Sequence, residues 1–248
     1  MRYITIEEAQ PGMCLAYDLY DSMGRTMIGR GCELTASYID KLRDYGFSGV
    51  YIDDELSKEI QIEASISEKL RTDGINCIKK SDIDHCAEIA AAIVDEILPR
   101  GEVSLDMLDL RSYDDYTSAH SVKVAVLCCV IGMGMQMNER DLNYLVTAAL
   151  LHDPGKLSIP PEILNKPGRL TPEEYQIMKK HAEYSYKLLS NRWDISAHIK
   201  QTVLLHHENY DGSGYPQGLL GKEQSIFVRI LHVADVYDAL TSKRPYKK

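Results

Sequence analysis

The chain has 248 residues, of which 44% are hydrophobic and 26% charged, a composition typical of one or two globular domains and not of a disordered protein. Its formal net charge of −9 argues against a broad DNA- or RNA-binding surface, which normally carries a basic stripe. An anionic ligand would therefore be held at a local site, by a few placed cations or metal ions.

The first sixty residues predict a small α+β module. Short segments at 4–6, 14–20 and 26–28 have strand composition and are joined by turns that contain glycine. Apolar residues then follow helical spacing from Thr35 to Gly46, and 49–52 predicts one more strand. We place the module at residues 1–62. Nothing in it names a ligand, so reception of a signal and dimerisation both stay open.

Helical signals dominate from residue 62 onward. Predicted helices cover 82–98, 120–131, 139–152, 195–208 and 225–243, with a Gly-rich loop at 211–221 before the last of them. Another helix begins at Thr171, where Thr, Pro and Glu have the spacing of a capping box. The fold class is therefore mainly α, with a helical connector over 63–104 and an all-α bundle over 105–248.

No stretch reaches the roughly 20 apolar residues that a membrane span needs, and the N-terminus lacks a signal-peptide pattern, so we expect no membrane segment and a cytoplasmic location. The six cysteines show neither a CxxC motif nor an even framework of spacings. Reduced thiols that mostly pack in the core are therefore expected.

Five of the eight histidines lie at landmarks of the predicted helices, and acidic residues accompany them. A lone helical histidine is more often structural than a ligand. Here Asp153 follows one histidine directly, Glu208 follows a histidine pair, and Asp235 lies inside the last apolar helix, where a carboxylate is costly unless paired or metal-bound. The five histidines are His120, His152, His181, His206 and His207.

Imidazole and carboxylate ligands on facing helices are how helical bundles build dinuclear metal sites. Mixed nitrogen and oxygen ligands favour iron, manganese or zinc over calcium or magnesium, and iron or manganese is preferred here. Asp153 is the natural bridge between two ions because a carboxylate has two oxygens. Two such ions can generate a bridging hydroxide near neutral pH and clamp both phosphate oxygens of an in-line displacement.

Lys156 lies three residues after Asp153, so a continuing helical turn would bring it beside the metal pair. It could there stabilise charge on a phosphate or help to protonate the leaving oxygen. A solvated lysine after a helix-ending glycine is the structural alternative.

These residues lie in longer motifs that resemble the HD-GYP domain family from about Leu105 onward. The motifs are His120, the run 150–156 (LLHDPGK), His181, the run 206–216 (HHENYDGSGYP), the run 234–240 (ADVYDAL) and the run 244–247 (RPYK). The long HHExxDGxGYP block is far more specific than a bare His-Asp pair. The Pro11-Gly12-Met13 segment loosely resembles a small module often found ahead of such domains.

The resemblance implies an HD-type bundle that hydrolyses cyclic di-GMP to pGpG, with GMP as a further product left open. It implies one metal on His120, His152, Asp153 and Asp235, and a second on Asp153, His181, His206 and His207. The metals are iron or manganese, with zinc as an alternative. Substrate contacts fall on Lys156, Gly214, Tyr215, Pro216, Asp238, Arg244 and Lys247; Asp238 is expected to hydrogen-bond near this site rather than bind metal.

Three features depart from the family pattern. Tyr116 replaces a glutamate that supports a third metal in some relatives, which predicts a dinuclear site. Pro154 replaces the usual isoleucine and disfavours a helical conformation at Asp153. The sequence also ends shortly after Lys247, so we expect the domain to lack C-terminal helices that relatives have. His232, one turn before Asp235, is expected to be a structural histidine.

Two other functions remain open besides cyclic di-GMP hydrolysis. One is an HD-type phosphohydrolase that acts on another cyclic dinucleotide or on a nucleotide monoester. The other is a catalytically slow, metal-containing module that senses the dinucleotide and contacts a signalling protein, which Pro154 would favour. A homodimer is a further open alternative.

Overall fold

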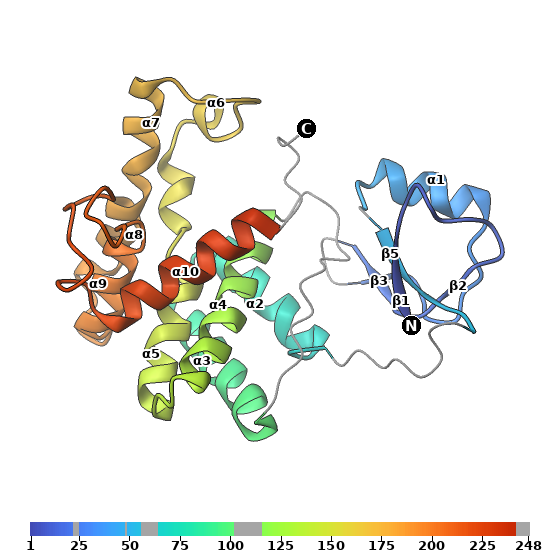
Figure 1. Ribbon diagram of the computed structural model, residues 1–248, viewed down its shortest axis with the longest axis horizontal. Helices are drawn as coiled ribbons and strands as arrows, with labels where there is room; N and C mark the ends of the chain where they lie inside the picture. The colour runs from blue at the N-terminus through green and yellow to red at the C-terminus, as the bar shows by residue number, and fades with distance from the viewer. Residues whose placement is uncertain (22–24, 48, 56–63, 102–115, 242–248) are drawn as a thin grey trace. The chain divides into compact units, whose positions relative to one another are not determined.

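The computed structural model describes residues 1–21, 25–47, 49–55, 64–101 and 116–241, with the side chains of Tyr116 and Thr117 not described. The chain divides into two compact units, one formed mainly by Met1–Thr72 and the other running from Asp73 onward. The mainly helical fold class with a small strand-containing N-terminal region is confirmed (Figure 1).

The N-terminal unit is built on a three-stranded antiparallel sheet in the order β1-β5-β2. The strands are β1 (Arg2–Thr5), β2 (Cys14–Leu15) and β5 (Gly49–Asp53), so the last strand in sequence lies between the first two. Strands β3 (Leu19–Tyr20) and β4 (Thr26–Ile28) form a separate antiparallel pair.

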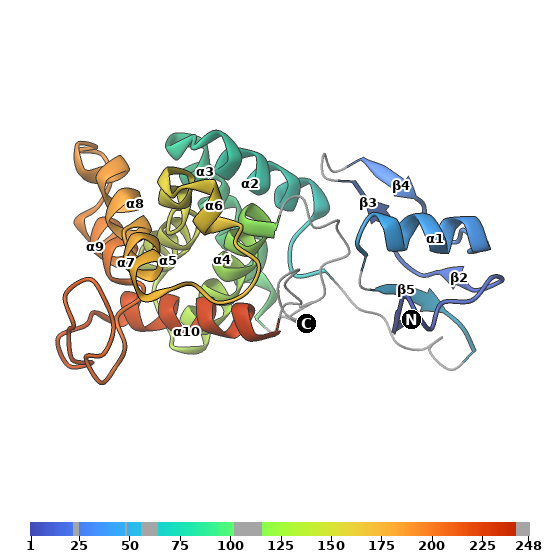
Figure 2. The ribbon, with the colours of Figure 1, turned by 90° about the horizontal axis from the view of Figure 1, so that it is seen from above.

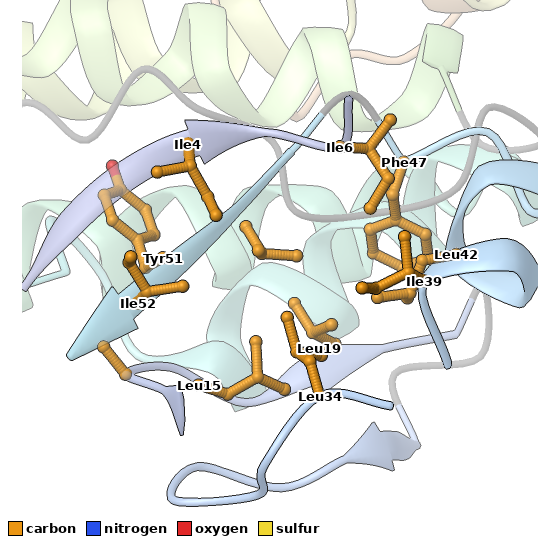
Figure 3. Packing of buried hydrophobic residues seen from close by; sticks show 12 residues of the cluster. Ile4, Ile6, Leu15, Leu19, Leu34, Ile39, Leu42, Phe47, Tyr51 and Ile52 are labelled. Carbon is orange, nitrogen blue, oxygen red and sulfur yellow. The ribbon is translucent and has the colours of Figure 1, made fainter. Parts of the chain in front are cut away.

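Helix α1 (Ala36–Asp44) begins and ends where the sequence predicts. The Thr35 side chain accepts a hydrogen bond from the Tyr38 N–H, and Gly46 follows the helix with a φ of +79° that favours glycine. Its buried residues Ile39 and Leu42 join Leu15, Leu19 and Val50 in one apolar core, part of which is shown in Figure 3. This core gives the N-terminal unit a packed interior of its own.

The second unit is a bundle of helices (Figures 1 and 2). Its elements are α2 (Glu68–Lys80), α3 (Ile83–Ile97), η1 (Leu98–Arg100), α4 (Tyr116–Gly134), α5 (Glu139–Leu150), η3 (Pro154–Ser158), α6 (Pro161–Leu164), α7 (Pro172–Lys179), α8 (His181–Ser190), α9 (Ala197–Leu205) and α10 (Ile226–Thr241). Fully buried aliphatic side chains from α3, α4, α5 and α10 make its interior, among them Ile93, Val124, Leu145 and Leu231.

Several predicted helix boundaries are wrong, and the errors fall at the histidines. Helix α4 starts at Tyr116, so His120 lies in its second turn and does not open it. Helix α5 ends at Leu150, before the pair His152 and Asp153. Helix α9 ends at Leu205, before the pair His206 and His207. The helix that begins after Thr171 stops at Lys179, and His181 opens a new helix instead of lying inside the first.

The capping box predicted at Thr171 is confirmed. Its side chain accepts from the Glu174 N–H at 3.2 Å, and the Glu174 carboxylate accepts from the Thr171 N–H at 2.7 Å. Helix α2 was not predicted as a separate element. None of the described helices is both long and apolar enough to cross a lipid bilayer.

Four of the six cysteines are buried, in keeping with the expected core packing, and Cys14 and Cys32 are partly exposed. Cys77 of α2 and Cys86 of α3 lie with their sulfur atoms 2.7 Å apart.

Candidate metal centre

The seven predicted ligand residues come from five parts of the bundle and meet in one cluster. His120 lies on α4, His181 opens α8 and Asp235 lies on α10, while the two remaining pairs follow the ends of α5 and α9. The pairs are His152 with Asp153 and His206 with His207. All seven are buried except His207, whose side chain is 21% exposed.

The ligand atoms form two groups of three. In the first, His120, His152 and Asp153 each offer one atom, and these atoms lie within 4.8 Å of one another. Asp235 extends this group, because its Oδ1 lies 3.0 Å from His120 Nε2. In the second group, His181, His206 and His207 offer ligand atoms within the same distance.

Asp153 lies between the two groups. Its Oδ2 is 3.2 Å from His152 Nε2 in the first group, and its Oδ1 is 3.4 Å from His181 Nε2 in the second. Each oxygen therefore faces a different set of imidazoles. This is the arrangement expected of a carboxylate that bridges two cations.

Hydrogen bonds to the backbone fix the tautomer of three of the rings. His152, His181 and His206 each donate Nδ1–H to the carbonyl three residues earlier, at 2.6 Å to Ala149, 2.7 Å to Met178 and 2.7 Å to Val203. We assign the proton to Nδ1 in each ring because a carbonyl can only accept. Each Nε2 then carries a lone pair that points into the cluster.

The Nε2 lone pairs of His181 and His206 face each other across 3.4 Å with no donor between them. His207 Nε2 lies 3.0 Å from His181 Nε2, on the same side of the cluster. His152 Nε2 and Asp153 Oδ1 are buried without any hydrogen-bond partner. Buried acceptors that converge in this way are costly unless a cation lies among them, so the residues fit a pair of divalent metal ions.

The local pKa shifts favour ligand-ready forms in the second group. Burial lowers the pKa of His206 well below its usual value, lowers that of His181, and together with the neighbouring His181 lowers the pKa of His207 to about 3. Although burial opposes it, the charges of His152 and Lys156 hold the pKa of Asp153 well below its usual range. Neutral imidazoles and an ionised carboxylate are the forms that bind metal.

His120 differs from the other rings because two carboxylates hold it. Its Nδ1 lies 2.6 Å from Asp238 Oδ2, and its Nε2 lies 3.0 Å from Asp235 Oδ1. Against the effect of burial, these two carboxylates raise the pKa of His120. The two carboxylates therefore favour the positively charged form of His120. Asp238, which is fully buried beneath the ring, fixes the orientation of the imidazole.

Lys156 lies at the solvent edge of the cluster. After α5 the chain continues into the short 3-10 helix η3, which begins at Pro154 and brings the Lys156 amine against Asp153 Oδ2. Asp153 already lies outside α5, with φ −109° and ψ −1°, so Pro154 interrupts no helix. The lysine side chain is 25% exposed, whereas that of Asp153 is buried.

The Gly-Tyr-Pro segment follows the histidine pair and folds back over it. The Tyr215 ring lies 4.8 Å from the His207 ring at an interplanar angle of 30°. Gly214 packs so closely that an added Cβ would lie 2.5 Å from His207 O. A side chain at that position would push the segment away from the cluster.

Glu208 holds this segment and takes no part in the metal groups. Its buried carboxylate accepts hydrogen bonds from the N–H groups of Gln217 at 2.6 Å, Gly218 at 3.1 Å and Leu219 at 2.9 Å. A carboxylate that accepts several backbone donors is a strong anchor. The third residue of the His-His-Glu triplet therefore positions the loop.

The sequence did not identify Ser185 as a supporting residue. Ser185 of α8 accepts from the Gly155 N–H at 2.9 Å and ties η3 to α8. It carries no motif of its own, so only the fold could reveal it. His232, expected to be structural, donates to the His206 carbonyl at 2.9 Å, in keeping with that role. Arg244 and Lys247 lie outside the described residues.

The fold and its His/Asp cluster define a helical-bundle protein of the HD type. A family model described as "HD domain" matches residues 103–248, and the chain belongs to this family. The resemblance to HD-GYP domains is confirmed by curated relatives.

The chain is 36% identical over 167 residues to "Cyclic di-GMP phosphodiesterase PA4108" of Pseudomonas aeruginosa, a match that covers 67% of this chain and 40% of the relative. It is 41% identical over 136 residues to "Cyclic di-GMP phosphodiesterase response regulator RpfG" of Xanthomonas campestris pv. campestris, covering 54% and 36%. The matches thus span about two fifths of the relatives' length.

Among solved structures, the fold is similar to that of Bd1817, described as an HDG"Y"P protein from Bdellovibrio bacteriovorus. The TM-score is 0.58, with 99% of this chain and 90% of that chain covered at 16% sequence identity. This similarity concerns the fold.

Proposed function

We propose that the chain is a metal-dependent phosphodiesterase that hydrolyses cyclic di-GMP to pGpG and further to GMP. The observation that carries the proposal is the position of Asp153, whose two oxygens face two separate groups of imidazole nitrogens. The names of two curated relatives, the Pseudomonas and Xanthomonas cyclic di-GMP phosphodiesterases, support the choice of substrate.

Two divalent cations, iron or manganese, would be held by the two groups of ligands. One would take His120, His152, Asp153 and Asp235, and the other Asp153, His181, His206 and His207. When bound, such a pair supplies a nucleophile from water near neutral pH and positive charge at the phosphate. Tyr116, the first residue of α4, offers no carboxylate, so we propose two metals and not three.

The protein's own groups would orient the substrate around this centre. The Lys156 amine is partly exposed beside Asp153 and is placed to contact a phosphate oxygen or the leaving oxygen. Gly214, Tyr215 and Pro216 line the edge beside His207. Asp238 would act through His120 by fixing its ring, because its carboxylate is fully buried.

The direct test is a product assay on protein loaded anaerobically with Fe(II) or, in a parallel sample, with Mn(II). Cyclic di-GMP, cyclic di-AMP and a nucleotide monoester are each incubated with the protein, and the products are separated by chromatography. We expect pGpG first and GMP later from cyclic di-GMP. Faster cleavage of the monoester would contradict the proposal, and tight binding of cyclic di-GMP without any turnover would identify a sensor instead.

A further inference from the structure

Beyond the metal ligands and the Gly-Tyr-Pro segment, helix α7 contributes a group of side chains beside the cluster. The Lys179 amine lies 4.9 Å from the centre of the Tyr175 ring and 5.3 Å from the centre of the Tyr215 ring. The two rings meet edge to face, with centroids 6.3 Å apart at 84°. Tyr215 in turn lies against His207.

These contacts form a continuous wall that leads outward from the metal centre. His207 is the one predicted ligand with appreciable exposure, at 21% of its side chain, and Tyr175 at the far end is 45% exposed. Lys179 lies between them and is partly buried. We call Tyr175, Lys179 and Tyr215 the α7 wall.

No carboxylate neutralises Lys179 within the described part of the chain, where none lies at ion-pair distance from its amine. Helix α7 carries two carboxylates, Glu173 and Glu174, and Glu174 is bound by Lys166 at 2.6 and 2.8 Å. A lysine held over two rings without an acidic partner keeps its positive charge for an anionic ligand.

An aromatic face with a lysine amine beside it has a specific chemical complement. Purine bases stack on exposed aromatic rings, at about 1–3 kcal/mol per base, and a lysine amine binds phosphate as a point charge. A ligand that carries both groups within a few ångströms of a phosphodiester bond is a dinucleotide. The wall is adjacent to the ring of His207, where the reacting phosphate would lie.

We propose that Tyr175 and Lys179 of α7 form, with Tyr215, a subsite that binds one purine base and the adjoining phosphate of the cyclic dinucleotide. The proposal rests on the proposed function and adds binding residues outside the family motifs. Stacking tolerates different bases, so the wall sets affinity for the dinucleotide and does not select between guanine and adenine.

The alternative is that Lys179 only fastens Tyr215 to α7. A cation over an exposed ring contributes about 0.5–1 kcal/mol, which such a contact could supply to stability alone. In that case substitutions would change the melting temperature and leave substrate affinity unchanged. The two roles therefore predict different results: the subsite predicts a change in substrate affinity, and the fastening role predicts a change in melting temperature alone.

The test uses the full chain loaded with Mn(II) and measures kcat and KM for cyclic di-GMP. It also measures the Kd of a phosphorothioate analogue that resists hydrolysis. Tyr175→Leu is expected to raise KM and Kd by roughly 5- to 150-fold, the range equivalent to the stacking energy, with kcat within about twofold. Tyr175→Phe keeps the ring and is expected to keep wild-type affinity.

Lys179→Ala is expected to raise KM and to weaken its dependence on salt, and Lys179→Arg to restore most of the affinity. Tyr45→Leu, at a tyrosine 54% exposed in the N-terminal unit, and Lys187→Ala, at an exposed lysine of α8, serve as matched controls that leave KM unchanged. Metal content is measured for every variant.

Unchanged KM and Kd in Tyr175→Leu and Lys179→Ala, in a wild-type protein that does cleave cyclic di-GMP, would overturn the subsite and leave the proposed function standing. Equal losses in Tyr175→Leu and Tyr175→Phe would also overturn it, because the ring would not be what matters. Absence of any cleavage by the metal-loaded wild type would overturn the proposed function. The Kd of the analogue would then decide the subsite, and a Kd unchanged in Tyr175→Leu and Lys179→Ala would overturn it.

Discussion

His181 and His206 direct their Nε2 atoms at each other across 3.4 Å, although each ring already donates its Nδ1–H to a backbone carbonyl. Neither nitrogen can donate to the other, so the pair is built for a shared positive partner. The same reasoning extends to His152 Nε2 and Asp153 Oδ1, which are buried without a hydrogen-bond partner, and it leads to predictions about metal binding.

Metal binding should stabilise the folded chain. A free Mn(II) concentration one hundred times Kd contributes ~2.7 kcal/mol, which at ~2–4 °C per kcal/mol for a chain of this size raises Tm by roughly 5–10 °C. Differential scanning calorimetry with Mn(II) and with excess chelator measures the difference. The same Tm in both samples would contradict the assigned ligands.

Asp238 should control metal affinity although it is not a proposed ligand. In Asp238→Asn, the amide presents either an N–H or a neutral carbonyl oxygen to His120 Nδ1, and the oxygen is a weaker acceptor than the carboxylate. The imidazole therefore loses its fixed tautomer. We expect metal affinity to fall by about 10- to 100-fold. Metal titration of this variant beside Asp84→Asn, a surface aspartate, measures the effect; equal affinities would show that His120 is oriented by other groups.

Asp153 and Lys156 should separate metal binding from turnover. Asp153→Ala removes the bridge and is expected to abolish both bound metal and activity. Lys156→Ala is expected to keep the metals and lose about 10²-fold in kcat, because the residue acts on the reacting phosphate. Elemental analysis and a cyclic di-GMP assay on both variants check this. Full activity in either variant would refute its assigned role.

Gly155 should not tolerate a side chain. An added Cβ would lie 2.5 Å from the Ser185 amide nitrogen and even closer to the His181 carbonyl, both rigid backbone atoms. Gly155→Ala is expected to destabilise the chain by about 1–3 kcal/mol and to weaken metal binding, because η3 must move away from α8. Gly134→Ala, at the open end of α4, is the matched control, since an added Cβ there meets no atom within 4 Å. Thermal melts that gave the two variants the same Tm would contradict this packing argument.

The thiols should fall into two reactivity classes. Burial raises the pKa of Cys129 to about 12 and that of Cys128 well above its usual value, and the contact with Cys77 raises the pKa of Cys86. A raised pKa keeps a thiol protonated and unreactive until the pH approaches it. Titration with a thiol reagent at pH 8 should show Cys14 and Cys32 reacting ahead of the four buried thiols, and equal rates for all six would be inconsistent with the fold.

The motifs predicted which residues lie together, but they did not predict how the backbone positions these residues. Apolar periodicity indicated a helix through His152 and another through His181, whereas the structure ends one helix before His152 and starts a new one at His181. The spacing of apolar residues carries no information about a histidine ring that donates a hydrogen bond to the carbonyl three residues before it. This local hydrogen bond is made only when the chain leaves regular helix or begins it.

Glu208 is a second residue whose contacts could not be predicted from the sequence. A carboxylate directly after two histidines resembles a ligand in sequence, yet it faces the backbone of the loop at 217–219. Its direction depends on how that loop returns, which is a matter of tertiary packing. By contrast, the cap at Thr171 involves only neighbouring residues, and the sequence predicted it.

The position of β5 between β1 and β2 bears on how the N-terminal unit forms during synthesis. Neither β1 nor β2 has its sheet partner until the chain has been made through Asp53, because both pair with β5 and not with each other. The sheet therefore closes only after β5 has been made, over a long loop, while the helices that follow rely mainly on local contacts and can form as the chain is extended.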